Sequence, residues 1–168
     1  MKKIIAILVV ALLFLGCSSK SEENKNVEAR LVIGKSLADL KLKDQNEKLT
    51  TIATDTKIVF FSFSKPTGHA CNKLLESKPA NFLAGHKAVY VADVSAAPGI
   101  IKSMFILPDL KKLKFQIHLI NDDQLSAEFT KGVDKKSIVV VTLDNLKITD
   151  IQNLKDASEL EKLFSIRK

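Results

Sequence analysis

The sequence is poor in the residues that usually reveal a catalytic or metal site. It has two cysteines, three histidines, one tyrosine and no tryptophan among 168 residues. No two histidines stand at the i, i+4 spacing of a typical metal site. It contains no Ser-His-Asp motif, no P-loop, no glycine-rich nucleotide-binding motif and no internal repeat. We therefore expect neither a metal site nor a bound cofactor.

Long hydrophobic runs are also scarce, and the clearest one is at the N-terminus. Lys2 and Lys3 carry two positive charges, and residues 4–15 are apolar without interruption. A membrane-spanning helix needs about 20 apolar residues, so this run is too short for one. A charged start, a short apolar stretch and a small residue at its end are the parts of a secretory signal.

The end of this signal carries a first family resemblance. Phe14-Leu15-Gly16-Cys17 resembles the lipobox of bacterial lipoproteins. The resemblance implies cleavage before Cys17, diacylation of its sulfur and acylation of its new amino group. Each buried methylene contributes about 0.8 kcal/mol, so three acyl chains would hold the protein firmly at a membrane. We expect residues 1–16 to be a lipoprotein signal peptide and residues 17–29 to be a lipidated, flexible tether.

The resemblance also implies a location in the cell envelope. Ser18, rather than an aspartate, follows the lipidated cysteine. By the sorting rule of Gram-negative lipoproteins, this favours the outer membrane, with the domain facing the periplasm. In a cell with one membrane, the domain would face outward.

The charge of the exported chain is mildly positive. Loss of residues 1–16 removes Lys2 and Lys3 and lowers the net charge from +7 to +5. The remaining lysines are spread along the chain, with small clusters at residues 111–114 and 131–136. Such a pattern is typical of a solvated surface, and the alternative is contact with anionic lipid or an acidic partner. An exported location argues against nucleic acid.

Cysteine usage restricts the redox chemistry. If Cys17 carries lipid, Cys71 is the only thiol of the mature protein. No disulfide can then form within the chain, although the compartment would allow one. A single remaining cysteine is either a buried, inert residue or a reactive thiol with an outside partner.

Residues 30–168 are long enough for one domain with its own core. Alternation and turn residues predict the following elements. In chain order they are a hairpin within 31–52, a strand at 58–63 covered on both faces, a helix at 69–76 capped by Thr67, an added turn at 80–83, a strand at 88–94, a helix from Pro98 to Leu107 stopped by Pro108, a strand at 115–120 followed by a turn at 121–123, a hairpin at 137–151 around Asp144-Asn145, and a closing helix at 157–166 with Leu160, Leu163 and Phe164 inward. Alternating strands and helices predict an α/β domain with a sheet between helices.

This order resembles the thioredoxin-like order. Residues 32–46 resemble the segment that comes before the first central strand in peroxiredoxins and thiol-disulfide reductases, and residues 57–64 resemble the strand that delivers the catalytic loop. The resemblance covers about residues 31–166. It implies a thioredoxin-like fold, a central mixed sheet flanked by helices, with an N-terminal β-hairpin.

The active-site motif of that family is missing. Thioredoxins carry Cys-x-x-Cys at the start of the first helix, because one thiol attacks a disulfide and the second releases the mixed disulfide. Thr67-Gly68-His69-Ala70 is the expected occupant here, or Gly68-His69-Ala70-Cys71 after a shift of one residue. The family's cis-proline is also missing, since Lys114-Phe115 stands at its expected position.

The peroxiredoxin pattern differs by one residue. In that family a Thr or Ser stands three positions before the reactive cysteine, whereas Thr67 is four positions before Cys71 and directly follows Pro66. The extra residue turns the hydroxyl about 100° around the helix. No arginine suits the family's activating role, because Arg30 and Arg167 lie near the ends of the domain.

Cys71 is nevertheless the best candidate for a catalytic residue, with Thr67 and His69 as modulators of its reactivity. A position near a helix N-terminus lowers the pKa of a thiol. The alternative is a small, inert residue packed in the first turns of the helix. His118 lies in an apolar strand, and we expect a hydrogen-bonded core histidine there.

Three functions remain open at this point. The leading one is an envelope lipoprotein whose thioredoxin-like domain has lost its redox site and serves as a binding or accessory module for an envelope protein. The alternative is a single-cysteine thiol oxidoreductase or peroxidase that acts through Cys71 with an external resolving thiol. The third is a purely structural lipoprotein.

Overall fold

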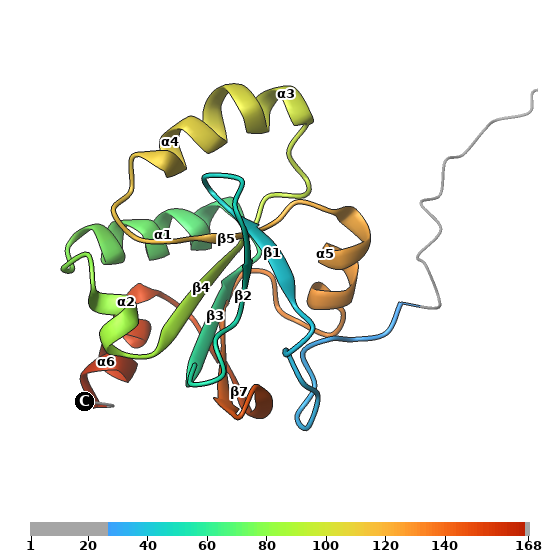
Figure 1. Ribbon diagram of the computed structural model, residues 1–168, viewed down its shortest axis with the longest axis vertical. Helices are drawn as coiled ribbons and strands as arrows, with labels where there is room; N and C mark the ends of the chain where they lie inside the picture. The colour runs from blue at the N-terminus through green and yellow to red at the C-terminus, as the bar shows by residue number, and fades with distance from the viewer. Residues whose placement is uncertain (1–26, 167–168) are drawn as a thin grey trace, which may run out of the picture.

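A seven-stranded mixed sheet forms the middle of the domain (Figure 1). The computed structural model describes residues 27–166, so the predicted signal peptide, Cys17 and residues 18–26 of the predicted tether lie outside the described residues. The strands are β1 (Lys41–Asp44), β2 (Leu49–Thr51), β3 (Ile58–Ser62), β4 (Ala88–Asp93), β5 (His118–Ile120), β6 (Ile138–Asp144) and β7 (Lys147–Leu154). They lie in the order β2-β1-β5-β4-β3-β6-β7.

The strand β3 is the centre of this sheet. It runs parallel to β4 and antiparallel to β6, and all of its residues are buried. Its unbroken apolar sequence predicted a strand covered on both faces, and the structure confirms this. Alternate side chains point to opposite faces of a strand. Phe60 accordingly packs into the core on one face, and Phe61 into the core on the other.

Helices cover both faces of the sheet. They are α1 (Lys65–Glu76), α2 (Phe82–Gly85), α3 (Gly99–Ile101), the π-helix η1 (Lys102–Ile106), α4 (Leu107–Lys111), α5 (Asp123–Thr130) and α6 (Ala157–Ile166). Residues of α1, α2, α4 and α6 share the core of Phe60, whereas α5 shares that of Phe61. Between residues 27 and 166, no helix combines the length and the apolar composition needed to cross a bilayer.

The two predicted hairpins are present. β1 pairs with β2 antiparallel, and β6 pairs with β7 antiparallel. Asn145 and Leu146 connect β6 to β7, and both have positive φ values, 46° and 65°. Two successive positive φ angles are the mark of a type I′ turn, whose twist matches that of the strands it joins.

The segment that leads into β1 lies along the start of β7. The amide of Gly34 donates to the carbonyl oxygen of Ile148, and the amide of Ile148 donates to that of Lys35, both at 2.8 Å. The amide of Leu37 donates to the carbonyl oxygen of Leu146 at 2.8 Å. These bonds cover part of an edge strand that would otherwise present unpaired backbone groups.

The segment between β4 and β5 differs from its prediction. Pro108 was expected to stop a helix at Leu107, but the helical path continues through η1 and α4 to Lys111. A proline clashes with the carbonyl four residues earlier in a regular helix. Here the amide of Leu107 bonds to the carbonyl of Lys102, five residues back, and this wider turn comes directly before Pro108.

Helix α5 was not predicted from the sequence. Asp122 was expected to lie in a turn, but its carboxylate accepts a hydrogen bond from the amide of Leu125 at 2.8 Å and caps this helix. Phe129, on its buried side, is inaccessible to solvent. An aspartate before an apolar residue at the helical period is an N-terminal helix signal, and it was available in the sequence.

Candidate functional site

Helix α1 begins earlier than the sequence predicted, and this moves the candidate site. Its N-cap is Ser64, so Thr67 is the third helical residue rather than the cap. The hydroxyl of Ser64 accepts from the amide of Thr67, and the amide of Ser64 donates to the hydroxyl of Thr67 at 3.2 Å. Such reciprocal bonds form a capping box. Pro66 fits the first turn, where a missing N–H costs nothing.

The motif position at the head of the helix is therefore Ser64-Lys65-Pro66-Thr67. This corrects the two predicted positions, 67–70 and 68–71, which lie inside the helix. Ser64 and Thr67 have the i, i+3 spacing of Cys-x-x-Cys, and their hydroxyl oxygens lie 2.9 Å apart. The hydroxyl of Thr67 also donates to the carbonyl of Ser64 at 2.9 Å. A pair of hydrogen-bonded hydroxyls thus stands at the head of α1.

The expected cis-proline position, Lys114-Phe115, does not lie beside the strand that leads into α1. Lys114-Phe115 comes before β5, which is separated from β3 by β4. The antiparallel neighbour of β3 is β6, which begins after Ser137. Every peptide bond between residues 27 and 166 is trans.

The two predicted modulators do not converge on Cys71. Thr67 lies one turn before Cys71 on the same buried face, but its hydroxyl is engaged by Ser64. His69 is exposed. Two residues correspond to about 200° of rotation in a helix, so His69 lies on the opposite side of α1 from Cys71.

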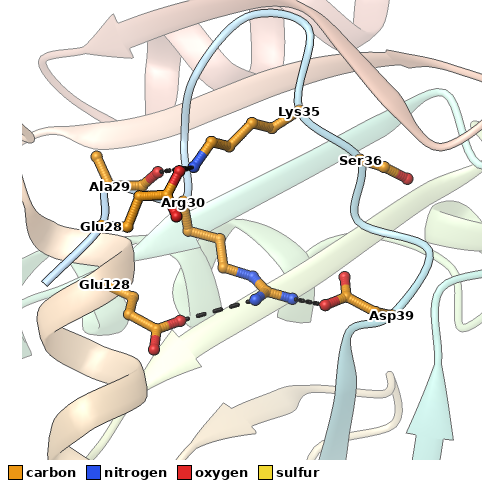
Figure 2. A pocket seen from close by; sticks show the side chains of 7 residues that line it. All are labelled: Glu28, Ala29, Arg30, Lys35, Ser36, Asp39 and Glu128. Carbon is orange, nitrogen blue, oxygen red and sulfur yellow. Dashed lines mark hydrogen bonds and ion pairs between the residues drawn. The ribbon is translucent and has the colours of Figure 1, made fainter.

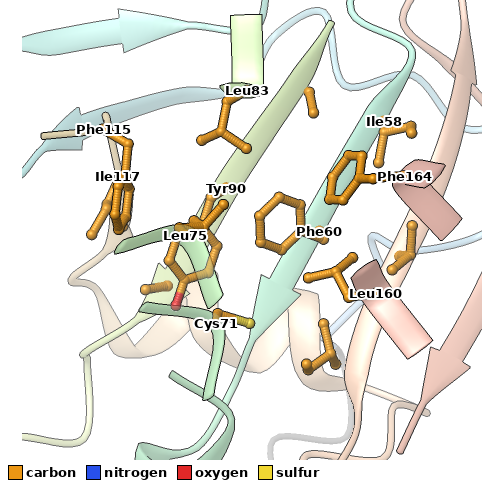
Figure 3. Packing of buried hydrophobic residues seen from close by; sticks show 14 of the residues in the cluster. Ile58, Phe60, Cys71, Leu75, Leu83, Tyr90, Phe115, Ile117, Leu160 and Phe164 are labelled. Carbon is orange, nitrogen blue, oxygen red and sulfur yellow. The ribbon is translucent and has the colours of Figure 1, made fainter. Parts of the chain in front are cut away.

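Cys71 itself is sealed in the core. It is the seventh residue of α1 and has no solvent exposure. Figure 3 shows its sulfur among Phe60, Leu75 and Tyr90, between α1 and the sheet. It is a free thiol.

The sulfur lies at the end of a short buried hydrogen-bonded chain that continues through Tyr90 to Ser62. Burial raises the pKa of Cys71 to about 12, against a smaller opposing effect of its hydrogen bond with Tyr90. The hydroxyl of Tyr90 lies 2.9 Å from that of Ser62. The phenolic oxygen of Tyr90 is therefore hydrogen-bonded to both Ser62 and Cys71, although the residue is fully buried. Burial raises the pKa of Tyr90 as well. The helix dipole was expected to lower the pKa of Cys71, but desolvation acts in the opposite direction and is the larger effect.

The raised pKa of Cys71 has a consequence for stability at alkaline pH. In the unfolded chain this thiol loses its proton near pH 9, whereas in the folded protein it keeps the proton up to about pH 12. The unfolded state therefore binds fewer protons in this window, and the free energy of unfolding should fall by about 1.4 kcal/mol per pH unit above pH 9. Urea unfolding at pH 8, 9 and 10 would measure this slope.

Cys71→Ala is the matched variant for that measurement. It should be less stable at pH 8 but should show a flatter decline above pH 9, because it has no thiol to titrate. An equal decline in both proteins would contradict the sealed, protonated thiol.

The histidines occupy separate places. His118 is buried in β5 as predicted, but its Nδ1 has no hydrogen-bond partner, so it is not fully hydrogen-bonded. Burial lowers the pKa of His118. His86 packs against Phe82 and Phe164, and its Nδ1 lies 2.9 Å from the carbonyl oxygen of Phe82. In the part of the chain that the structure describes, no three His, Cys, Asp or Glu residues lie together as a metal site requires.

A polar hollow on the other face was not predicted from the sequence. It has a volume of about 370 Å³ and lies between the segment that leads into β1 and helix α5 (Figure 2). Arg30 spans it, with ion pairs to Asp39 at 2.7 Å and to Glu128 at 3.7 Å. Lys35 pairs with Glu28 beside it. The charges are paired with one another, so the hollow holds the N-terminal segment against the domain and has no free charge cluster for a substrate.

The last residues of the predicted tether also contact the domain. Lys131 donates to the carbonyl oxygen of Val27, and the amide of Arg30 donates to the carbonyl oxygen of Glu128 at 2.9 Å. The guanidinium of Arg30 lies 5.7 Å from the centre of the Phe129 ring. The chain is thus attached to α5 from Val27 onward.

Comparison with known proteins places the fold. No protein-family model matches the chain, and no curated protein sequence matches it. Solved structures do match. A putative protein disulfide isomerase from Bacteroides thetaiotaomicron has a TM-score of 0.53 and 14% identity, over 83% of this chain and 90% of that one.

Two further solved structures match this chain to a similar extent. A putative thioredoxin from Neisseria meningitidis has a TM-score of 0.53 and 16% identity, over 79% of this chain and 89% of its own. A peroxiredoxin-like protein from Aquifex aeolicus has a TM-score of 0.52 and 10% identity, over 84% of this chain and 91% of its own. The fold is therefore thioredoxin-like, a mixed sheet flanked by helices, as the sequence predicted. At these identities the likeness establishes the fold alone.

Proposed function

We propose that this chain is an envelope lipoprotein, anchored through Cys17, whose thioredoxin-like domain binds a partner protein and does not exchange disulfides. The observation that carries the proposal is the pair of hydrogen-bonded hydroxyls of Ser64 and Thr67 at the head of α1, 2.9 Å apart. The lipobox supports the anchor, and the exported location supports an envelope protein as the partner.

The chemistry of the pair supports the absence of disulfide exchange in this proposal. Disulfide exchange requires a thiolate that attacks one sulfur and a second thiol that closes the ring. Hydroxyl groups perform neither step, because they form no disulfide. What they retain is the capping geometry, which satisfies backbone groups at the N-terminus of α1. A scaffold of this kind can still present the surfaces of the fold to a partner, since a fold carries no activity apart from its sites.

A second candidate function is favoured by the kind of proteins that share the fold, which include thiol-disulfide and peroxide enzymes by their names. In this candidate a peroxide oxidises the thiol of Cys71 to a sulfenic acid and leaves as water or alcohol, and external thiols then reduce Cys71. The burial of Cys71 and its pKa of about 12 count against it.

Installing the missing thiols tests the proposal. Wild-type protein should reduce an insulin-type disulfide no faster than the dithiothreitol background, whereas Ser64→Cys/Thr67→Cys should gain turnover, because the two positions already face each other at the helix N-terminus. Ser64→Cys alone is the matched control and should form mixed disulfides without turnover. Wild-type turnover, or wild-type peroxide consumption, that disappears in Cys71→Ser would contradict the proposal and favour the second candidate.

The anchor has its own measurement. The intact mass of protein purified from bacterial membranes should show loss of residues 1–16 and the addition of three acyl chains at Cys17. An unprocessed chain, or a mature chain without lipid, would refute this part of the proposal and leave the hydroxyl-pair argument standing.

A further inference from the structure

An exposed apolar face lies on the segment between β4 and β5. Along α3 and η1, four large apolar side chains face solvent: Ile100 is 70% exposed, Ile101 42%, Met104 64% and Phe105 58%. They follow an i, i+4 pattern and therefore lie on one side of the helical segment. In Figure 1 this segment forms the upper margin of the molecule, with no other element drawn above it.

The opposite side of the same segment is fixed to the domain. Leu110 is buried, and Ile106, Leu107 and Leu113 pack against the core of Phe60. The outward direction of Met104 and Phe105 is therefore set by packing and does not reflect a loosely held loop. A contiguous apolar cluster on a fixed surface element marks an interaction site with a protein or a membrane.

The charged residues around this face distinguish a membrane partner from a protein partner. Residues 99–114 contain four lysines, no arginine and a single acidic residue. The acidic residue, Asp109, is paired with Lys112 at 2.7 Å. Lys111 and Lys114 are exposed. Protein interfaces are enriched in arginine and depleted in lysine, whereas helices that lie on membranes combine large apolar residues with lysines beside them.

We infer that residues 99–114 dock the domain on an anionic lipid surface, with Ile100, Met104 and Phe105 inserted among the headgroups and the flanking lysines on the lipid phosphates. Long lysine side chains can extend past the apolar contact to reach those phosphates. The inference rests on the proposed function in one respect, namely that the chain is held beside a membrane.

The anchor would make a weak docking contact effective. Cys17 and Val27 are ten residues apart in the sequence. Ten residues span at most about 36 Å, so a lipidated Cys17 keeps the domain within that distance of the bilayer. A short link of this kind raises the local concentration of the docking face at the membrane into the millimolar range.

A tryptophan at the docking face provides the test, since the chain has none of its own. Full-length Phe105→Trp, purified from membranes, is placed in phosphatidylcholine vesicles with or without phosphatidylglycerol, with a brominated phosphatidylcholine as quencher. We expect a blue shift and strong quenching only with phosphatidylglycerol. Leu49→Trp, at a position 61% exposed on β2, is the matched control and should stay unquenched.

Charge reversal measures the electrostatic part. In the Phe105→Trp protein, Lys111→Glu/Lys114→Glu should lower the ratio of docked to undocked protein at least roughly 25-fold, because each lysine near an anionic surface contributes about a fivefold factor. Lys155→Glu/Lys162→Glu makes the same change in net charge on and beside α6 and should leave the quenching nearly unchanged.

Three results would overturn the inference. They are quenching of Phe105→Trp no greater than that of Leu49→Trp, equal quenching in both kinds of vesicle, and a blue shift that is present without vesicles. The last would indicate a protein contact, such as a second copy of the chain. Co-flotation with neutral vesicles measures the anchor separately, so a failed anchor and a failed docking face are distinguishable.

Discussion

Alkylation of Cys71 in the folded protein should be at least roughly a thousandfold slower at pH 7 than alkylation of a free model thiol. Two effects combine. A thiol with a pKa of about 12 is almost entirely protonated at pH 7, and the thiolate is the nucleophile. The sulfur also has no solvent exposure, so a reagent reaches it only after helix α1 opens. Iodoacetamide labelling, followed by mass spectrometry of the peptide that contains Cys71, would measure the rate.

An exposed thiol on the same fold supplies the control. Ser165→Cys in a Cys71→Ala background places a sulfur on the exposed side of α6 and should react at the rate of a free thiol. In denaturant, Cys71 should react just as fast. Fast labelling of Cys71 in the native protein would show that its helix opens readily and would favour the alternative, a one-thiol reaction, over the proposed function.

Phe60→Ala should lower the free energy of unfolding by about 3–5 kcal/mol. The ring is inaccessible to solvent in the central strand, stacks on Tyr90 with ring centres 4.8 Å apart and meets the edge of Phe164 at 5.9 Å. Its removal leaves a cavity between β3, α1 and α6 that the surrounding side chains fill only in part. Chemical denaturation monitored by circular dichroism would give the change.

Phe105→Ala is the matched control for that measurement. It makes the same substitution at a ring that is 58% exposed, so it should change the stability by less than about 1 kcal/mol. A change in the free energy of unfolding by Phe60→Ala no larger than that by Phe105→Ala would mean that the core on this face of the sheet does not depend on the ring of Phe60.

Elements with a clear repeat of apolar residues were predicted correctly from the sequence. The closing helix has the predicted bounds, Ala157–Ile166, and buries Leu160, Leu163 and Phe164, because its apolar residues repeat at the helical period. Helix α5 was missed because it is short and follows a run of turn-forming residues. The continuation past Pro108 depends on a π-turn, which local propensity does not reveal.

The position of the candidate site was the harder part. Thr67 was taken as the helix cap because the recognisable helical residues follow it, but Ser64 forms the cap through its bond with the backbone of Thr67. The burial of Cys71 had a visible signal, since Thr67, Cys71 and Leu75 repeat every four residues and all three are buried. The polar hollow around Arg30 joins residues up to 100 positions apart, and no local pattern indicates such contacts.

The way the N-terminal segment is fastened determines how the domain would bear a mechanical load. A pull applied at Val27 first reaches its bond with Lys131 at the end of α5. It next reaches Arg30, whose ion pair with Glu128 and backbone bond connect it to α5, and then the backbone bonds of Gly34 and Leu37 with the β6–β7 hairpin. The strain is thereby divided between two separate supports before it reaches β3. A protein suspended by its N-terminus would retain its central strands after the outermost fastening had yielded.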